Sequence, residues 1–222
     1  MPMDASDPAF KGQRDFTPLT LRFYDPFVLS FSARWIWNCP VERLVENYRW
    51  HVRPNHLDVG PGTGYFLRHS GLERGSAVTI LDPNMAVLRH AAAHLDGYDV
   101  TAVEADVLKP LPVRGPFGSV GMNLVLHCLP GPMARKSAAI RNIAAVLHPD
   151  GMFFGSTVLG DEARHSWAAR RMLAFYNGRG SFDNRTDTEE NVRQVIAASF
   201  EHVEFEVVGS VAIWYAMGPR SG

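Results

Sequence analysis

The chain has 222 residues, of which 46% are apolar, and this is enough to bury a full core in what is most economically a single domain. Its 22 Lys and Arg residues nearly balance its 23 Asp and Glu residues, so no basic field is present to hold a polyanion. The composition therefore argues against DNA or RNA as a partner, and two cysteines are too few for a disulfide framework.

The sequence also lacks the usual signals of secretion and membrane insertion. Residues 1–7 contain neither a basic segment nor an apolar run, and no stretch approaches the roughly 18 apolar residues of a membrane span. We therefore expect a cytoplasmic protein without membrane contact. Cys39 and Cys128 show no paired metal-ligand spacing, and we predict no bound metal.

Residues 1–50 are predicted to form an N-terminal arm followed by an aromatic-rich helical cap. Residues 1–18 are polar and contain three prolines. The aromatic residues of the next stretch are Phe23, Tyr24, Phe27, Phe31, Trp35 and Trp37. Two interpretations stay open for these rings, namely a helical layer packed on the domain surface or a cap over a ligand pocket. Pro40 fits the first turn of a helix that runs to about Trp50.

Residues 51–222 hold the predicted core, which is organised around a glycine-rich turn. His56–Val59 reads as a buried strand and Tyr65–Leu72 as the start of a helix. The glycines of the turn between them are Gly60, Gly62 and Gly64. Glycine permits positive φ and leaves no Cβ between peptide N–H groups and a ligand, while the helix N-terminus favours an electron-rich group. The alternative is a tight turn with no ligand.

Two acidic residues follow the next two predicted strands. Residues 77–82 read as a strand that ends in Asp82, and Pro83 opens a helix to about Leu95. A carboxylate at such a strand end can accept two hydrogen bonds from ribose hydroxyls, although Asp82 could instead be only a helix cap. Asp106 follows the third strand in the same way.

The remaining chain continues the alternation of helix and strand. We predict strands at residues 98–105, 119–126, 152–158, 202–208 and 211–217, and helices at residues 132–147 and 186–200, the latter capped by Thr186 and Glu189. Two residues cannot make a crossover, so the last two strands must be antiparallel. Residues 160–185 contain a probable helix and are either a lid insertion or a solvated surface excursion.

These motifs together resemble the class I S-adenosylmethionine-dependent methyltransferases, nearest in style to the ubiquinone/menaquinone-biosynthesis type. The resemblance implies an α/β, single-domain, Rossmann-like fold with a seven-stranded sheet. That sheet is mostly parallel, with a C-terminal antiparallel hairpin and helices on both faces. It implies S-adenosylmethionine as cofactor, with Asp82 on the ribose and Asp106 on the adenine amino group. The positions that it assigns to cofactor binding are Asp58, Gly60, Pro61, Gly62, Gly64, Asp82, Pro83, Asp106, Val107 and Asn123.

The implied function is methyl transfer to a small, largely apolar or aromatic metabolite, with the acceptor atom left open. Two rivals are a nicotinamide-dependent oxidoreductase, disfavoured by the glycine spacing and the final hairpin, and a non-catalytic binding protein. His127 follows the fourth strand and is either a general base or a wall residue hydrogen-bonded into the loop. We expect Tyr24 and its neighbours to close over the cofactor. The oligomeric state stays open, with a homodimer as one possibility.

Overall fold

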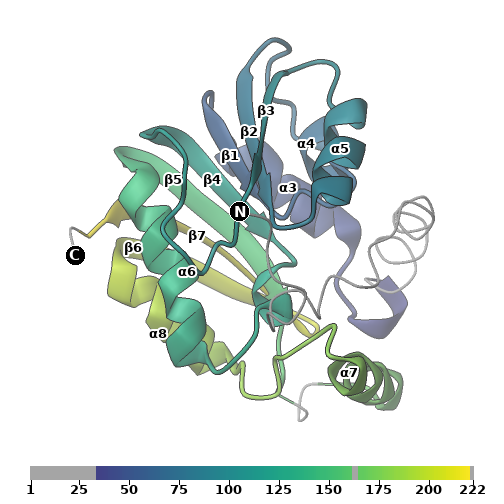
Figure 1. The fold of residues 1–222 in the computed structure, drawn as a ribbon. Coiled ribbons are helices and arrows are strands. Elements are labelled where there is room, and N and C mark those ends of the chain that lie inside the picture. Colours follow the sequence, from purple (N-terminus) through teal and green to yellow (C-terminus); the bar gives the residue numbers. More distant parts are fainter. Residues whose placement is uncertain (1–33, 162–164, 221–222) are drawn as a thin grey trace.

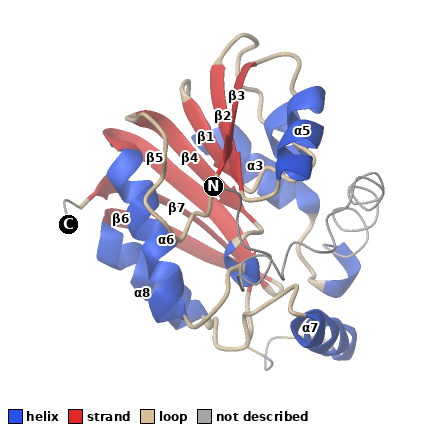
Figure 2. Cartoon of the chain, in the orientation of Figure 1, coloured by secondary structure: helices blue, strands red, loops and turns tan. Residues whose placement is uncertain are grey.

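A computed structural model describes residues 34–161 and 165–220, which form one seven-stranded sheet with helices on both of its faces (Figures 1 and 2). The strands are β1 (His56–Val59), β2 (Ala77–Asp82), β3 (Asp99–Glu104), β4 (Phe117–Asn123), β5 (Leu147–Val158), β6 (Phe200–Val208) and β7 (Val211–Pro219). The helices are α3 (Val41–His51), α4 (Tyr65–His69), α5 (Met85–His94), η2 (Leu126–Cys128, a 3₁₀ turn), α6 (Met133–Val146), α7 (Trp167–Arg179) and α8 (Glu189–Ser199).

The strand order is β3-β2-β1-β4-β5-β7-β6, with β1 to β5 parallel and β7 antiparallel to both of its neighbours. This confirms the predicted mostly parallel sheet with an antiparallel C-terminal pair. The order reverses between β1 and β4, so the connections that leave these two adjacent strands go to opposite sides. A parallel sheet places its ligand crevice at the carboxyl ends of such strands.

Apolar side chains cover both faces of the sheet. One face packs against α6 and α8 through residues such as Val120, Ile140 and Ile196, and the other packs against α3, α4 and α5 through residues such as Ile80 and Leu88. The inner strands β1 and β4 are therefore buried on both sides, as expected for a sheet sandwiched between two helical layers, whereas the edge strand β3 is largely exposed.

Helix α3 is fixed on the sheet by polar as well as apolar contacts. Asn47 Nδ2 donates to the carbonyl oxygens of Gly155 and Trp214, each at 3.3 Å. These bonds tie the helix to β5 and β7 at once. Just before α3, the Trp37 side chain is buried whereas that of Trp35 is 66% exposed. The predicted cap residue Tyr24 lies outside the described residues.

Some predicted boundaries were wrong, and local geometry explains each difference. Helix α4 ends at His69 rather than at Leu72, because Gly71 has a φ of 78° that no longer continues a helix. Strand β4 ends at Asn123 rather than at residue 126, because Leu124 has a φ of 56° and turns the chain out of the sheet.

Two further differences concern the start of a strand and the N-cap of a helix. Strand β5 begins at Leu147 rather than at residue 152, and its register against β4 shifts near this start. The cap of α8 is Thr188 rather than Thr186, because Thr188 Oγ1 accepts the Asn191 N–H at 3.2 Å.

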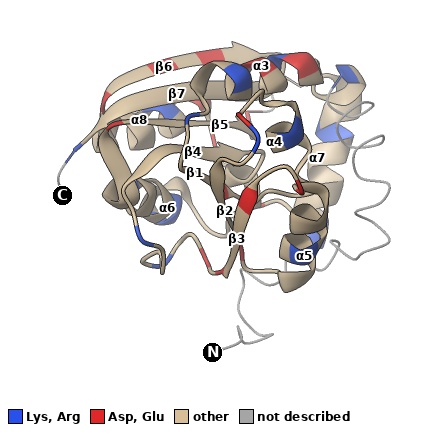
Figure 3. Ribbon diagram, turned by 90° about the horizontal axis from the view of Figure 1, so that it is seen from above, with Lys and Arg blue, Asp and Glu red and all other residues tan. Residues whose placement is uncertain are grey.

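Edge strand β6 carries acidic side chains at exposed positions, which are Glu201, Glu204 and Glu206 (Figure 3). Charges on an edge strand oppose pairing with another chain. Figure 3 also shows basic and acidic residues interspersed over the other elements in that view, in keeping with the net charge of −1.

Helix α7 lies beyond the carboxyl end of β5 (Figure 1), and the segment after it is anchored by a buried ion pair. Lys136 Nζ of α6 contacts Asp187 Oδ2 at 2.5 Å, and both side chains are fully buried. Burial raises the pKa of the Asp187 carboxyl to about 6, against the opposing effect of the Lys136 charge. The connection from α7 to α8 is thereby fixed on α6, next to the crevice described above.

Candidate active site

A pocket occupies the carboxyl ends of β1, β2 and β4. Its lining comes from the glycine turn, the ends of β2 and β4, the segments after β3 and β4, and the helices α3, α4 and α5. Its sequence-predicted members are Gly60, Pro61, Gly62, Asp82, Pro83, Asp106, Val107 and Asn123. Its other members include Tyr48, Thr63, Tyr65, Phe66, Leu81, Val87, Leu124, Val125, Cys128, Leu129 and Pro130. Residues far apart in the sequence therefore meet where the strand order reverses.

The three glycines of the turn all have positive φ, but they serve different purposes. A Cβ on Gly60 would lie 2.4 Å from Val125 Cγ2, so glycine is needed for the close approach of the loops after β1 and β4. A Cβ on Gly62 would meet no protein atom within 4 Å, so within the protein this glycine is needed only for its positive φ. Gly64 is the N-cap of α4, packs near Leu95 and does not line the pocket.

Asp58 is buried behind the glycine turn and does not line the pocket. Its Oδ1 accepts a hydrogen bond from Tyr48 Oη at 2.8 Å, and burial raises the pKa of its carboxyl to about 7. Tyr48, which sequence reasoning did not assign to the site, does line the pocket and stacks on Phe66 at 5.3 Å between ring centroids. Asp58 thus holds a pocket residue.

Asp82 and Asp106 both line the pocket, each with one oxygen held by the backbone. Asp82 Oδ1 accepts the Asn84 N–H at 2.7 Å, and Asp106 Oδ1 accepts the Leu108 N–H at 2.9 Å. The N-cap of α5 is Asn84, whose side chain accepts the Ala86 N–H at 2.9 Å, so Asp82 is not the cap. Burial raises the pKa of Asp82 to about 7, against the Asn84 hydrogen bond.

The end of β4 supplies a fixed amide to the pocket wall. Asn123 Oδ1 accepts a hydrogen bond from Ser156 Oγ. Its Nδ2 is buried and has no partner among the described residues, so it is a donor for which the surrounding chain offers no acceptor. A buried donor without a partner costs free energy, and a ligand acceptor would remove that cost.

His127 is buried behind this wall and does not line the pocket. The Val158 N–H donates to its Nδ1 at 3.2 Å, and a backbone N–H can only donate, so the proton of the neutral ring lies on Nε2. Burial, with the nearby Lys136 charge, lowers the pKa of His127 to about 3. These contacts match the interpretation of a residue hydrogen-bonded into the loop.

No group of three or more His, Cys, Asp or Glu residues that could hold a metal ion occurs within 34–161 and 165–220. No helix in those ranges is long and apolar enough to cross a membrane.

Residues 38–195 match the profile of a family described as a methyltransferase domain. The chain belongs to this methyltransferase family. It is 35% identical over 216 residues to the physcion biosynthesis cluster O-methyltransferase of Aspergillus chevalieri, which covers 96% of this chain and 97% of that one. It is 36% identical over 190 residues to the N-methyltransferase vrtF of Penicillium aethiopicum, at 83% and 78% coverage.

Solved structures share the fold of this methyltransferase. The N-methyltransferase NodS of Bradyrhizobium japonicum in complex with S-adenosyl-L-homocysteine superposes with a TM-score of 0.59 at 13% identity, covering 80% of this chain and 85% of NodS. The prediction of a class I S-adenosylmethionine-dependent methyltransferase is confirmed, and so are its fold, its enzymatic nature and its cofactor. The oxidoreductase and the non-catalytic protein are thereby set aside.

The residues of the pocket fit this cofactor. A turn with no Cβ at Gly60 and Gly62, two backbone-held carboxylates and the unpaired Asn123 amide are the groups that an amino acid and a nucleoside require. The apolar members after β4 were not predicted, because they follow no motif. Their one sequence signal is their place directly after a core strand.

We expect cofactor affinity to depend on the ionisation of Asp82. Ribose hydroxyls favour the ionised carboxylate, whereas the ligand-free carboxyl, with a pKa of about 7, is mostly protonated below that pH. The association constant for S-adenosylhomocysteine should therefore rise about tenfold from pH 6 to pH 8. Titration calorimetry of the wild type and of Asp82→Asn measures this rise, which the variant should lack. An equal rise in both proteins would contradict the ribose assignment.

Proposed function

We propose that this methyltransferase transfers the methyl group to a hydroxyl oxygen of a small, largely aromatic metabolite. The main support is an apolar wall of the pocket. Phe66 of α4 forms one part of it, and Leu124, Leu129 and Pro130, which follow β4, form the other. An aromatic acceptor gains most from such a wall, because flat apolar surfaces supply most of the contact area in small-molecule sites. A relative that covers 96% of the chain and is named an O-methyltransferase supports oxygen as the acceptor atom.

The cofactor would be held by residues from both sides of the place where the strand order reverses, between β1 and β4. Asp82 accepts hydrogen bonds from the ribose hydroxyls, and Asp106 accepts one from the adenine amino group. The peptide N–H of Gly62 binds the amino-acid part, because Pro61 has no N–H and the Gly60 N–H donates to the Leu81 carbonyl oxygen. Asn123 Nδ2 donates to the same part of the ligand, while Pro61, Pro83 and Val107 contribute apolar wall. When bound, S-adenosylmethionine supplies a methyl group on a sulfonium, which is a strong electrophile.

In this proposal the protein holds the acceptor oxygen near the methyl group and excludes water from the pocket, and it supplies no general base. The pocket residues would hold the acceptor oxygen against the bound cofactor, which would supply the methyl group and leave as neutral S-adenosylhomocysteine, while the acceptor's proton would pass to bulk solvent. Holding the oxygen about 3 Å from the methyl carbon can lower the barrier by roughly 7–11 kcal/mol. The ring of His127 points its acceptor nitrogen at the Val158 N–H, and so is assigned to holding the loop.

Two segments are proposed to complete the substrate side as a lid. These are residues 1–50, with Tyr24 outside the described part, and residues 160–185, which include α7. Helix α7 packs its buried Ala169 and Leu173 in one cluster with Trp37, so the two segments are joined by apolar contact. The division into a cap of residues 1–50 and a core of residues 51–222 stays a proposal, and a cytoplasmic location stays an expectation.

A matched pair of acceptors tests the chemistry. With labelled S-adenosylmethionine, 2-naphthol should yield its methyl ether, whereas 2-naphthylamine, which has the same skeleton, should be methylated at least tenfold more slowly. Product formation is measured by chromatography and mass spectrometry. Preferential methylation of the amine would overturn the oxygen assignment, and transfer to RNA with steep salt dependence would overturn the small-molecule assignment.

His127→Asn tests whether a base is used. The Asn Oδ1 can accept the Val158 N–H in place of Nδ1, so we expect kcat within about fivefold of wild type and an unchanged pH–rate profile. A loss of about 10²–10⁴ in kcat, with unchanged cofactor affinity, is the outcome expected of a missing general base and would restore that role to His127.

A further inference from the structure

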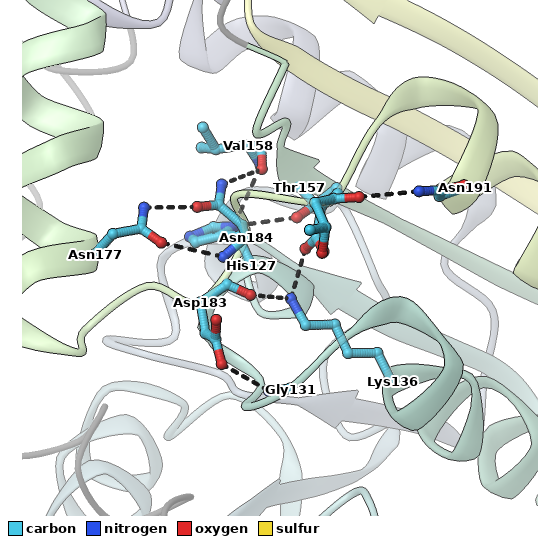
Figure 4. A network of polar contacts seen from close by, with 11 residues as sticks. His127, Gly131, Lys136, Thr157, Val158, Asn177, Asp183, Asn184 and Asn191 are labelled. Atoms are coloured by element: carbon cyan, nitrogen blue, oxygen red, sulfur yellow. Dashed lines mark hydrogen bonds and ion pairs between the residues drawn. The ribbon is translucent and has the colours of Figure 1, made fainter.

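One residue outside the pocket holds both ends of the segment that forms part of its wall. Asp183, in the connection between α7 and α8, donates its backbone N–H to the carbonyl oxygen of His127 at 2.9 Å. Its carboxylate Oδ2 accepts the backbone N–H of Gly131 at 2.7 Å (Figure 4). His127 and Gly131 are four positions apart, so Asp183 spans the residues between them.

The spanned residues line the pocket. They are Cys128, Leu129 and Pro130. Asp82, the residue assigned to the ribose, lines the same pocket as these three residues. A shift of this segment would therefore change the shape of the site where the cofactor binds.

The main chain of Asp183 is itself fixed by buried groups. Lys136 Nζ donates to the Asp183 carbonyl oxygen at 2.7 Å (Figure 4). The same ammonium group pairs with Asp187. The neighbouring Asn184 donates through Nδ2 to the Val158 carbonyl oxygen at 2.8 Å, and Asn177 Nδ2 donates to its Oδ1 at 3.0 Å. We call the two hydrogen bonds that join Asp183 to His127 and to Gly131 the clamp. The main chain of Asp183 is its fixed part, and the bond from Gly131 to the carboxylate is the contact that a substitution can remove.

The replaceable contact is the bond from Gly131 to the Asp183 carboxylate. The Asp183 side chain is exposed, so removing it leaves no buried charge and keeps both main-chain bonds of Asp183. Gly131 has a φ of 92°, a conformation that lies outside regular structure and is held by this bond between Pro130 and the start of α6. Without it, Asp183 holds the wall segment only at its His127 end, through the main-chain bond.

We propose that Asp183 is a positioning residue, whose carboxylate sets the cofactor-binding wall at Cys128–Pro130 through the Gly131 N–H. This rests on the binding of S-adenosylmethionine in the pocket described above. The role requires a hydrogen-bond acceptor and does not require a negative charge, so asparagine should replace Asp183 whereas alanine should not. Asp183 also connects the segment after α7, which belongs to the proposed lid, to the wall of the cofactor pocket.

The test compares Asp183→Ala, Asp183→Asn and the control Asp150→Ala, which removes an exposed carboxylate at the opposite end of β5. We expect the Kd for S-adenosylhomocysteine, measured by calorimetry, to rise about tenfold in Asp183→Ala. It should stay within about twofold of wild type in the other two. With saturating cofactor, kcat of Asp183→Ala should fall no more than about threefold while KM for the cofactor rises.

Hydrogen exchange of the Gly131 amide in the ligand-free protein tests the clamp independently of any ligand. Exchange should be slow in wild type and Asp183→Asn and at least tenfold faster in Asp183→Ala. If the wild-type protein did not bind S-adenosylhomocysteine, the cofactor assignment would be wrong. The exchange rate of the Gly131 amide would still test the role of Asp183. Unchanged exchange, unchanged affinity in Asp183→Ala, or an equal loss of affinity in both Asp183 variants would overturn the proposal.

Discussion

The pocket depends on the close approach of two turns at the place where the strand order reverses. The turn after β1 passes the segment after β4 so closely that a Cβ on Gly60 would lie 2.4 Å from Val125 Cγ2. Leu124 makes this approach possible by adopting a φ of 56°, and its N–H donates to the Ser156 carbonyl oxygen at 2.9 Å. A left-handed leucine is strained, and such strain is common in the walls of functional sites.

The carboxyl ends of the parallel strands also bring together carboxyl groups that are partly or wholly buried. Asp58, Asp82 and Asp106 come from consecutive strand ends, and each accepts one hydrogen bond from the protein itself. Burial raises the pKa of Asp58 and Asp82, so a ligand that donates hydrogen bonds to Asp82 or carries positive charge nearby stabilises the ionised form of that carboxyl. A cationic cofactor with a ribose and an amino group matches that need, which connects the electrostatics of the pocket to methyl transfer.

Sequence reasoning succeeded where local pattern decides the structure. The bounds of β1 and β2 agree with the prediction, and Asp82 and Asp106 were placed in the pocket because acids after core strands must meet at one edge of a parallel sheet. It failed where contacts between distant residues decide. The His127 ring is oriented by Val158, 31 positions away, and Asp183 meets Gly131 across 52 positions, so no local pattern announces either contact.

The central claim is that the crevice between the ends of β1, β2 and β4 holds the nucleoside of S-adenosylmethionine. A crystal structure of the chain with bound S-adenosylhomocysteine measures this most directly. The account predicts ribose hydroxyls within 3.2 Å of the Asp82 carboxylate and the adenine amino group directed at Asp106. A nucleoside bound away from Asp82, with the glycine turn at Gly60 and Gly62 untouched by ligand, would contradict it.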